Sequence, residues 1–211
     1  MVRQERAEAT RNAVLSAAAE IFARDGYAAA NLGVIIDKSG VTKGSLYFHF
    51  ASKEDLARGV IDEGVRRMEV ACAPLTDLRD PALEVMIGLS YLVTDIASED
   101  PIVGAMFRLH HEIGDHRGTG KNVVDTWRER QIALTQRGQA EGDLGADADP
   151  VDIGTFVFET LFGVRVVAHA TGTLDELPAR LERAWHFMLP ALVDPSKVDY
   201  FRQFAVRRSR R

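Results

Sequence analysis

The sequence predicts an all-α protein, with a three-helix helix-turn-helix domain at residues 1–52 and a larger helical domain at residues 53–211. Apolar residues recur at the 3.6-residue spacing of amphipathic helices along most of the chain. No segment alternates convincingly as a half-buried strand does, and glycine- or proline-containing breaks separate the helical segments. We therefore expect helices near residues 5–25, 32–39, 43–49, 53–73, 81–98, 101–112, 121–141, 150–171, 175–193 and 197–206.

Three of these expected helices begin after the same dipeptide, Asp-Pro, at residues 80–81, 100–101 and 149–150. An aspartate before a helix accepts hydrogen bonds from the free N–H groups of the first turn. Proline has no N–H group and is therefore well placed at the first helical position. Each pair is interpreted as the start of a helix.

The composition argues against secreted and membrane-spanning proteins. The 211 residues are 46% hydrophobic and 27% charged, which is typical of a globular protein. The single cysteine, Cys72, cannot form an internal disulfide. The N-terminus has no apolar signal-peptide core, and no stretch approaches the roughly 20 apolar residues of a membrane span. We expect a cytoplasmic protein.

The segment from Asn31 to Lys53 carries the clearest functional pattern. A short helix ends at Gly40, which can form the tight turn of a helix-turn-helix unit, and Thr42 can cap a second short helix. Ser52, with Asp55 three residues later, resembles a capping box for the next helix.

The local charge of this segment is suited to binding nucleic acid. The net charge of the chain is −5, but residues 38–53 contain three lysines and no acid. A protein with an acidic total needs such a local positive surface to bind DNA. The small or cationic residues Lys43, Gly44 and Ser45 would leave the first turn of the second helix open to base edges. The pattern alone also allows a plain structural helix pair, with Tyr47 and Phe48 in the core.

The stretch GVTKGSLYFHFASKEDL at residues 40–56, preceded by an amphipathic helix and Gly26-Tyr27, resembles the DNA-binding domain of the TetR family of repressors. The resemblance implies a dimer that binds a pseudo-palindromic operator in double-stranded DNA and leaves it when a small ligand binds. It implies that Thr42, Lys43, Gly44 and Ser45 face the operator. It also implies that Tyr47, His49 and Lys53 hold phosphates, and that Phe48 and Phe50 fasten the short helices to the first one.

A narrower resemblance links residues 3–27, 40–57, 126–129 and 163–167 to the γ-butyrolactone autoregulator receptors of actinobacteria. In that group a tryptophan at the position of Trp127 lines the ligand pocket. The implied ligand is a γ-butyrolactone, a butenolide or a furan. The alternative within the family is a sensor of another hydrophobic molecule, such as a drug, an acyl derivative or a steroid.

The larger domain, residues 53–211, contains apolar residues that could form a ligand pocket and a dimer interface. Because ligand pockets are mostly apolar with few polar groups, we expect Trp127 to be joined by Met86, Leu89, Tyr91, Val93, Met106, Phe107, His110, Phe162 and Val166, although each could be plain core. Residues 149–171 are apolar on nearly every face, so that helix and the next one are expected to pair with their symmetry mates. The expected interface residues are Phe158, Leu161, Arg165, Leu181, Trp185 and Met188.

The sequence motifs that could indicate an enzyme match poorly. His110, His111, Glu112 and His116 cluster, but His111 and His116 are five residues apart, which does not match the spacing of a zinc-protease helix. Residues 118–121 resemble a phosphate-binding loop but lack its first glycine and its Ser or Thr. We expect no enzyme activity, cofactor or metal. A helical interaction module without a DNA role remains an alternative, and the arginine-rich end at residues 202–211 is either a frayed tail or an auxiliary DNA contact.

Overall fold

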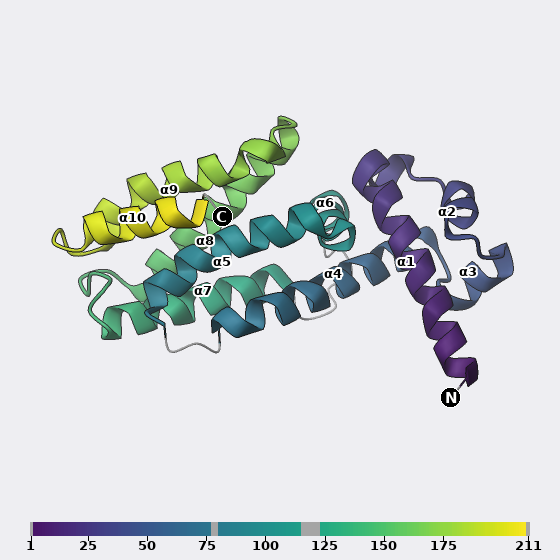
Figure 1. Cartoon of the computed structure of the whole chain (residues 1–211), viewed down its shortest axis with the longest axis horizontal. Coiled ribbons are helices and arrows are strands. Elements are labelled where there is room, and N and C mark those ends of the chain that lie inside the picture. Colours follow the sequence, from purple (N-terminus) through teal and green to yellow (C-terminus); the bar gives the residue numbers. More distant parts are fainter. Residues whose placement is uncertain (1, 77–79, 115–122, 210–211) are drawn as a thin grey trace. The chain divides into compact units, whose positions relative to one another are not determined.

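The computed structural model describes residues 2–76, 80–114 and 123–209, and these segments are almost entirely helical (Figure 1). They hold no β-strand, only an isolated bridge between Leu144 and Val193. The helices are α1 (Val2–Ala29), α2 (Leu32–Ser39), α3 (Lys43–His49), α4 (Lys53–Thr76), α5 (Ala82–Glu99), α6 (Pro101–Ile113), α7 (Val123–Ala140), α8 (Pro150–Ala170), a short 3₁₀ turn η1 (Leu174–Glu176), α9 (Leu177–Leu192) and α10 (Val198–Ser209). The predicted all-α fold class is confirmed.

The chain forms two compact units, which are described separately. The first comprises residues 1–71 and 95–119, and the second comprises residues 72–94 and 120–211. Helix α4 contributes residues to both units. These units differ from the expected functional division between residues 52 and 53, because α6 packs against α1 and therefore belongs to the first unit. The functional division remains a prediction.

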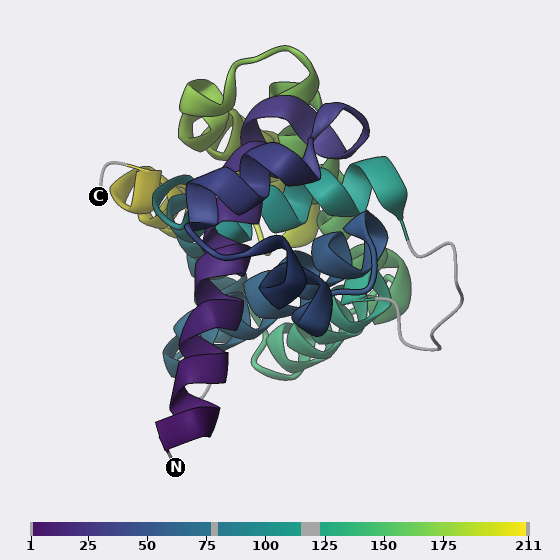
Figure 2. The same ribbon diagram turned by 90° about the vertical axis from the view of Figure 1, so that its right-hand side faces the viewer.

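The core of the first unit fastens α2 and α3 to α1, which lie together in Figure 2. Apolar side chains from α1, including Leu15 and Phe22, are fully buried there together with Ile35 of α2 and Leu46 of α3. Ile102 and Leu109 of α6 belong to the same core. Leu32 and Ile36 of α2 also pack against this core.

Helix α6 holds the C-terminal end of α1 through hydrogen bonds. The Arg108 guanidinium donates to the carbonyl oxygen of Ala23 at 2.7 Å, and Glu112 accepts the backbone N–H of Tyr27. Between them lies Gly26, whose φ of 78° interrupts α1. A Cβ at Gly26 would come within 2.7 Å of both Arg108 and Glu112, so this close approach requires glycine.

An ion network joins α4 to α6 within the first unit. Arg67 bonds Glu63 at 2.8 Å and Asp100 at 2.9 Å, and Asp100 also caps α6 by accepting the N–H group of Ile102. The hydrogen bond from Arg66 is the largest of the effects that lower the pKa of Glu63 to about 2. Asp100 therefore serves both as the expected helix cap and as the far end of this network.

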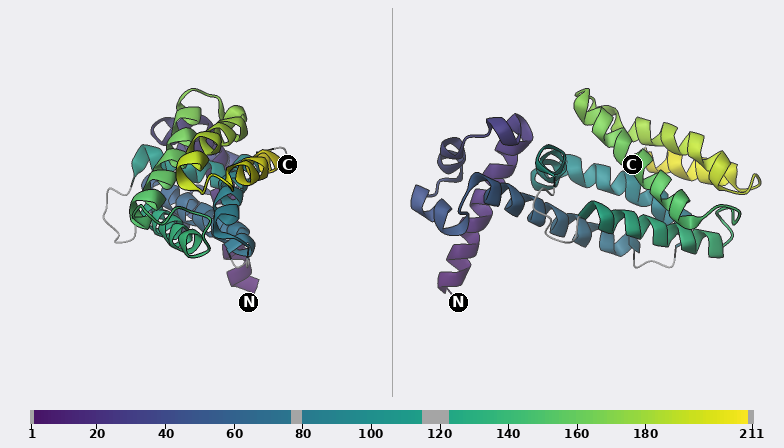
Figure 3. Two further views of the ribbon diagram at one scale, coloured as in Figure 1. Left: turned by 90° about the vertical axis from the view of Figure 1, so that its left-hand side faces the viewer. Right: turned by 180° about the vertical axis from the view of Figure 1, so that it is seen from behind.

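The second unit is built on a core shared by α5, α7, α8, α9 and α10, whose ribbons run alongside one another in Figure 3. Trp185 is fully buried there, and its Nε1 donates to Ser90 Oγ at 3.0 Å. Phe201 and Ala205 anchor α10 in this core. The expectation of a frayed basic tail is therefore wrong for residues 202–209, while Arg210 and Arg211 lie outside the described residues.

All three Asp-Pro pairs precede a helix, as predicted, and the aspartate side chain caps the helix at two of them. Asp100 and Asp149 both cap their helices through their side chains. At the start of α5, the N–H of Ala82 instead donates to the carboxylate of Glu141 at 2.7 Å. The proline still marks the helix start there, but the hydrogen-bond acceptor comes from the end of α7.

The Glu63 network gives a pH-dependent prediction. Glu63→Gln should lower the free energy of unfolding at pH 7 by about 1 kcal/mol, since Arg66 is mostly exposed and screening weakens the pair. A carboxylate with a depressed pKa stabilises the fold above its ordinary value of 4.5 and loses that effect as pH falls toward about 2. The difference from wild type should therefore shrink between pH 4.5 and pH 2.5 in urea titrations. A constant difference, or the same pH trend in the α1 control Glu5→Gln, would contradict this role.

Candidate nucleic-acid interface

Local hydrogen bonds set the turn between α2 and α3. Gly40 ends α2 in the left-handed conformation, with φ of 70°, and its N–H donates to the carbonyl oxygen of Ile36. Thr42 caps α3 as predicted, because its side chain accepts the N–H of Ser45 at 3.1 Å. The predicted bounds of α2 and α3 agree with the structure, and the two helices form a helix-turn-helix unit on α1.

The two sides of α3 have different environments. Leu46 and Phe50 are buried in the core of the first unit. Thr42, Lys43 and Gly44 are exposed, and Ser45 is half-buried at the same turn. Tyr47 is also exposed and His49 is half-buried. Six of the seven predicted residues therefore lie on α3 or at its cap, with the first turn open to solvent as base contact in a major groove requires, and Lys53 begins α4.

Phe48 corrects one expectation. We expected it to fasten α3 to α1 together with Phe50, but its side chain is 80% exposed, whereas that of Phe50 is 3% exposed. Phe48 lies two residues after the buried Leu46, so it projects from a different side of the helix. Its ring lies edge-on to that of the neighbouring His49, with 5.1 Å between the ring centroids.

Two of the three lysines counted in the sequence have partners. Lys38 forms a 2.7 Å ion pair with Glu20 of α1, so an acid outside the counted window offsets part of the local charge. Lys53 Nζ donates to the carbonyl oxygen of Ala28 at 3.0 Å and lies 4.9 Å from the centre of the Tyr27 ring. Lys43, by contrast, is exposed in the first turn of α3.

The start of α4 is fixed by a variant of the expected capping box. Ser52 Oγ accepts the N–H of Asp55, as expected. The Asp55 carboxylate reaches back to the N–H of Ala51 at 3.0 Å rather than to that of Ser52. The first turn of α4 is therefore held close to the end of α3.

The expected pocket residues are divided between the two units. Trp127, Leu89, Phe162 and Val166 are half-buried in the second unit, where Met86 is fully buried. Tyr91, which is buried, and Val93, which is half-buried, also belong to the second unit, whereas Met106, Phe107 and His110 belong to α6 in the first unit. Met106 packs against α4, where a Cβ added at Gly64 would lie 2.5 Å from its Cβ.

Two buried polar atoms in the second unit bear on ligand binding. Tyr91 is only 3% exposed, yet its hydroxyl has no hydrogen-bond partner among the described residues, and burial raises its pKa. The side-chain nitrogen of Gln131 is likewise buried and has no hydrogen-bond partner among the described residues. The sequence reasoning missed Gln131, although its spacing of four residues from Trp127 places both on one face of α7.

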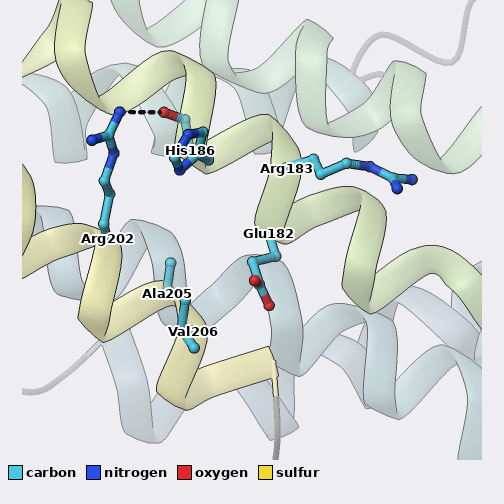
Figure 4. A pocket seen from close by; sticks show the side chains of 6 residues that line it. All are labelled: Glu182, Arg183, His186, Arg202, Ala205 and Val206. Carbon is cyan, nitrogen blue, oxygen red and sulfur yellow. Dashed lines mark hydrogen bonds between the residues drawn. The ribbon is translucent and has the colours of Figure 1, made fainter.

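A small hollow between α9 and α10 does not match the expected ligand pocket. Its volume is about 110 Å³, and Arg202 of α10 donates there to the carbonyl oxygen of His186 (Figure 4). The lining is mostly charged: Glu182, Arg183, His186, Arg202, Ala205 and Val206. Apolar ligand pockets are typically about 300–1,000 Å³, so this hollow is too small and too polar for such a ligand.

Half of the expected dimer residues lie inside the chain's own core. Leu181, Trp185 and Met188 are buried within the second unit, so they have almost no area left for a partner. This corrects their assignment. Phe158, Leu161 and Arg165 are half-buried, and burial lowers the pKa of Arg165 to about 10.

The apolar side chains that α8 and α9 do expose were missed by the sequence reasoning. They are Val151, Phe156 and Val167 on α8 and Phe187 on α9, of which Phe187 is 76% exposed. Phe156, Gly163 and Val167 lie seven and eleven residues apart and so share one face of α8. Each of these helices has more apolar residues than its buried face holds. The extra residues could have been identified from the sequence as candidates for an exposed face.

Comparison with known proteins identifies the family. Residues 14–60, which include α2 and α3, match the family described as bacterial regulatory proteins, tetR family. The chain is 34% identical over 168 residues to the HTH-type transcriptional regulator UidR of Escherichia coli K12, covering 76% of this chain and 82% of that protein. The chain belongs to the TetR family.

Other relatives point to one part of the TetR family. The A-factor receptor protein of Streptomyces griseus is 26% identical over 205 residues, which span 96% of this chain and 70% of that protein. A crystal structure of a γ-butyrolactone receptor (ArpA-like protein) is similar with a TM-score of 0.83 and 28% identity, over 97% of this chain and 98% of that one. CprB from Streptomyces coelicolor, in complex with its operator sequence, is similar with a TM-score of 0.82, 28% identity and the same coverage.

As a TetR-family member the chain is a transcriptional repressor and not an enzyme. The described residues contain no group of three His, Cys, Asp or Glu side chains suited to a metal ion. His116 and residues 118–121, whose sequence resembles a phosphate-binding loop, lie outside the described residues. Within the described part of the chain, no helix is long and apolar enough to cross a membrane.

The exposure of Lys43 gives a prediction for DNA binding. Lys43→Ala should weaken operator binding by about 1–3 kcal/mol, since it removes a charged contact from the open turn of α3. The measurement is fluorescence anisotropy with an operator duplex at fixed salt. The matched control is Lys38→Ala, whose lysine is paired with Glu20 and should matter less. Unchanged affinity of the Lys43 variant would refute its role.

Proposed function

We propose that the chain is a ligand-responsive repressor that acts in the cytoplasm as a homodimer on a pseudo-palindromic operator. The observation that carries the proposal is the first turn of α3, capped by Thr42 and exposed at Lys43 and Gly44, with Leu46 and Phe50 buried behind it. Thr42, Lys43, Gly44 and Ser45 would face base edges, and Tyr47, His49 and Lys53 would hold phosphates. The similarity to CprB, described in complex with its operator, supports this role.

The homodimer rests on the exposed apolar faces of α8 and α9. Phe156, Gly163 and Val167 of one subunit would pack against the same face of the other, with Phe187 alongside. A two-fold axis there would present two α3 helices to successive major grooves, whose centres are about 34–36 Å apart. The operator would accordingly be close to an inverted repeat.

The proposed ligand is a γ-butyrolactone or a related butenolide or furan. Similarity to the A-factor receptor and to γ-butyrolactone receptors supports this class. Trp127 would supply an apolar wall, and the free hydroxyl of Tyr91 and the side-chain nitrogen of Gln131 are donors suited to the carbonyl and ring oxygens of a lactone.

Release would follow from coupling along α4. This helix begins beside α3 and contributes residues to both compact units, so a change in its tilt would alter the spacing of the two α3 helices. A ligand can act in this way only through a difference in its affinity for the two spacings.

The dimer face gives the first prediction of the proposed function. Phe187→Asp should raise the dimer dissociation constant by at least tenfold, since it places a carboxylate in an apolar interface. Analytical ultracentrifugation measures the change. The control Val70→Asp alters a similarly exposed apolar residue on α4 and should leave the dimer intact. A stable Phe187→Asp dimer would place the interface elsewhere.

The ligand site gives the second prediction. Wild-type protein should retard DNA from upstream of its own gene in a gel-shift assay, and an organic extract of the culture medium or a synthetic γ-butyrolactone should release it. Trp127→Ala should bind the DNA normally but should not be released at the same ligand concentration.

If the Trp127 variant is released normally, Trp127 does not bind the ligand and is only a core residue. Release of the wild type by an unrelated drug, fatty acyl compound or steroid, and not by the lactone, would favour another hydrophobic ligand.

A further inference from the structure

Phe48 is the most exposed of the large hydrophobic side chains in the described residues, and it lies on the helix that the proposed function places on DNA. Burying a phenylalanine side chain typically stabilises a fold by about 1.5–3 kcal/mol. The exposed Phe48 does not contribute this stabilisation, whereas Phe50, two residues later, is buried in the core of the first unit. Such placement is better explained by a contact outside the chain than by folding.

Gly44 lies one helical turn before Phe48, on the same face of α3. Side chains on a helix lean toward its N-terminus, so the Phe48 ring leans over the turn that contains Gly44. A Cβ added at Gly44 would meet nothing within 4 Å. No contact within the described residues therefore requires glycine there, although glycine is a weaker helix former than alanine. The outward face of α3 therefore carries the exposed Phe48 ring and, one turn before it, open space at Gly44.

The surroundings of Phe48 favour DNA over a protein partner. The neighbouring exposed residues of α3 and its cap are polar or cationic: Thr42, Lys43 and Tyr47. A protein interface needs a continuous apolar patch, whereas a single ring among hydrogen-bonding groups suits a groove lined with polar base edges and isolated methyl groups. Helix α3 has seven residues, about 10 Å in length, so its last turn can also lie within a major groove about 12 Å wide.

We propose that Phe48 is a specificity-determining residue that packs on the 5-methyl group of a thymine in each half of the operator. That methyl group is the apolar feature of the major groove, and phenylalanine is one of the side chains that contact it. The ring lies edge-on to that of His49. Gly44 leaves room for the base pair to approach the helix. The inference rests on the proposed function, because it assumes that α3 enters the groove.

The test replaces thymine by uracil, which removes the methyl group and leaves the base-pairing and hydrogen-bonding groups unchanged. An operator duplex obtained by selection from random sequences is made with one symmetric pair of thymines replaced at a time. Loss of one buried methyl group should weaken wild-type binding about fourfold per half-site, or somewhat more than tenfold for the dimer. This loss is expected at one position of the half-site.

The variant Phe48→Ala completes a thermodynamic cycle. It should bind the thymine operator at least tenfold more weakly than wild type and should show no further loss on the uracil operator, because the two changes remove the same contact. The salt dependence of its binding should match that of wild type, since no phosphate contact is lost, whereas Lys53→Ala, which removes a proposed phosphate contact, should reduce it. Circular dichroism should show an unchanged fold, since the side chain is exposed.

The inference fails if uracil affects wild type and Phe48→Ala by the same factor at every position, or if Phe48→Ala binds as well as wild type. If wild-type protein selects no DNA sequence at all, the proposed function itself fails. The control Val70→Ala, at an exposed apolar residue of α4 outside the proposed DNA and dimer surfaces, should retain the full sensitivity to uracil.

Discussion

The burial of one face of α3 is the constraint on which the other features of the site depend. Leu46 and Phe50 lie in the core of the first unit, and that packing sets which residues of the helix face outward. Gly40 and Thr42 fix where the helix begins, so the outward residues of its first turn cannot slip by one position. Recognition by a helix requires such a fixed register, because a shift of one residue rotates its side chains by about 100°.

The features that the sequence predicted correctly are those determined by neighbouring residues. The bounds of α2 and α3 follow from a glycine that can adopt positive φ and from a threonine that can cap the next turn. Asp149 acts in the same local way at α8. The sequence could not show that Glu141 would serve the start of α5, or that Glu20 would pair with Lys38, because these partners meet only in the folded chain.

The features that the sequence predicted incorrectly concern which apolar side chains face the core. Helix α9 carries more apolar residues than its buried stripe needs, and Trp185 and Met188 belong to that stripe whereas Phe187 does not. In α3 the consecutive aromatic residues similarly hid the difference between Phe48 and Phe50. Hydrophobicity alone cannot make this distinction, since the packing of neighbouring helices decides which side is covered. In both helices the exposed ring belongs to a surface proposed to meet a partner.

The most direct measurement of the account is selection of random-sequence DNA duplexes by the purified full-length chain, followed by sequencing of the bound pool. Two outward α3 helices related by a two-fold axis should enrich an inverted repeat whose half-sites are centred about one helical turn, or a whole multiple of it, apart. A pool without any enriched sequence, or one with a single half-site and no symmetric copy, would contradict the account.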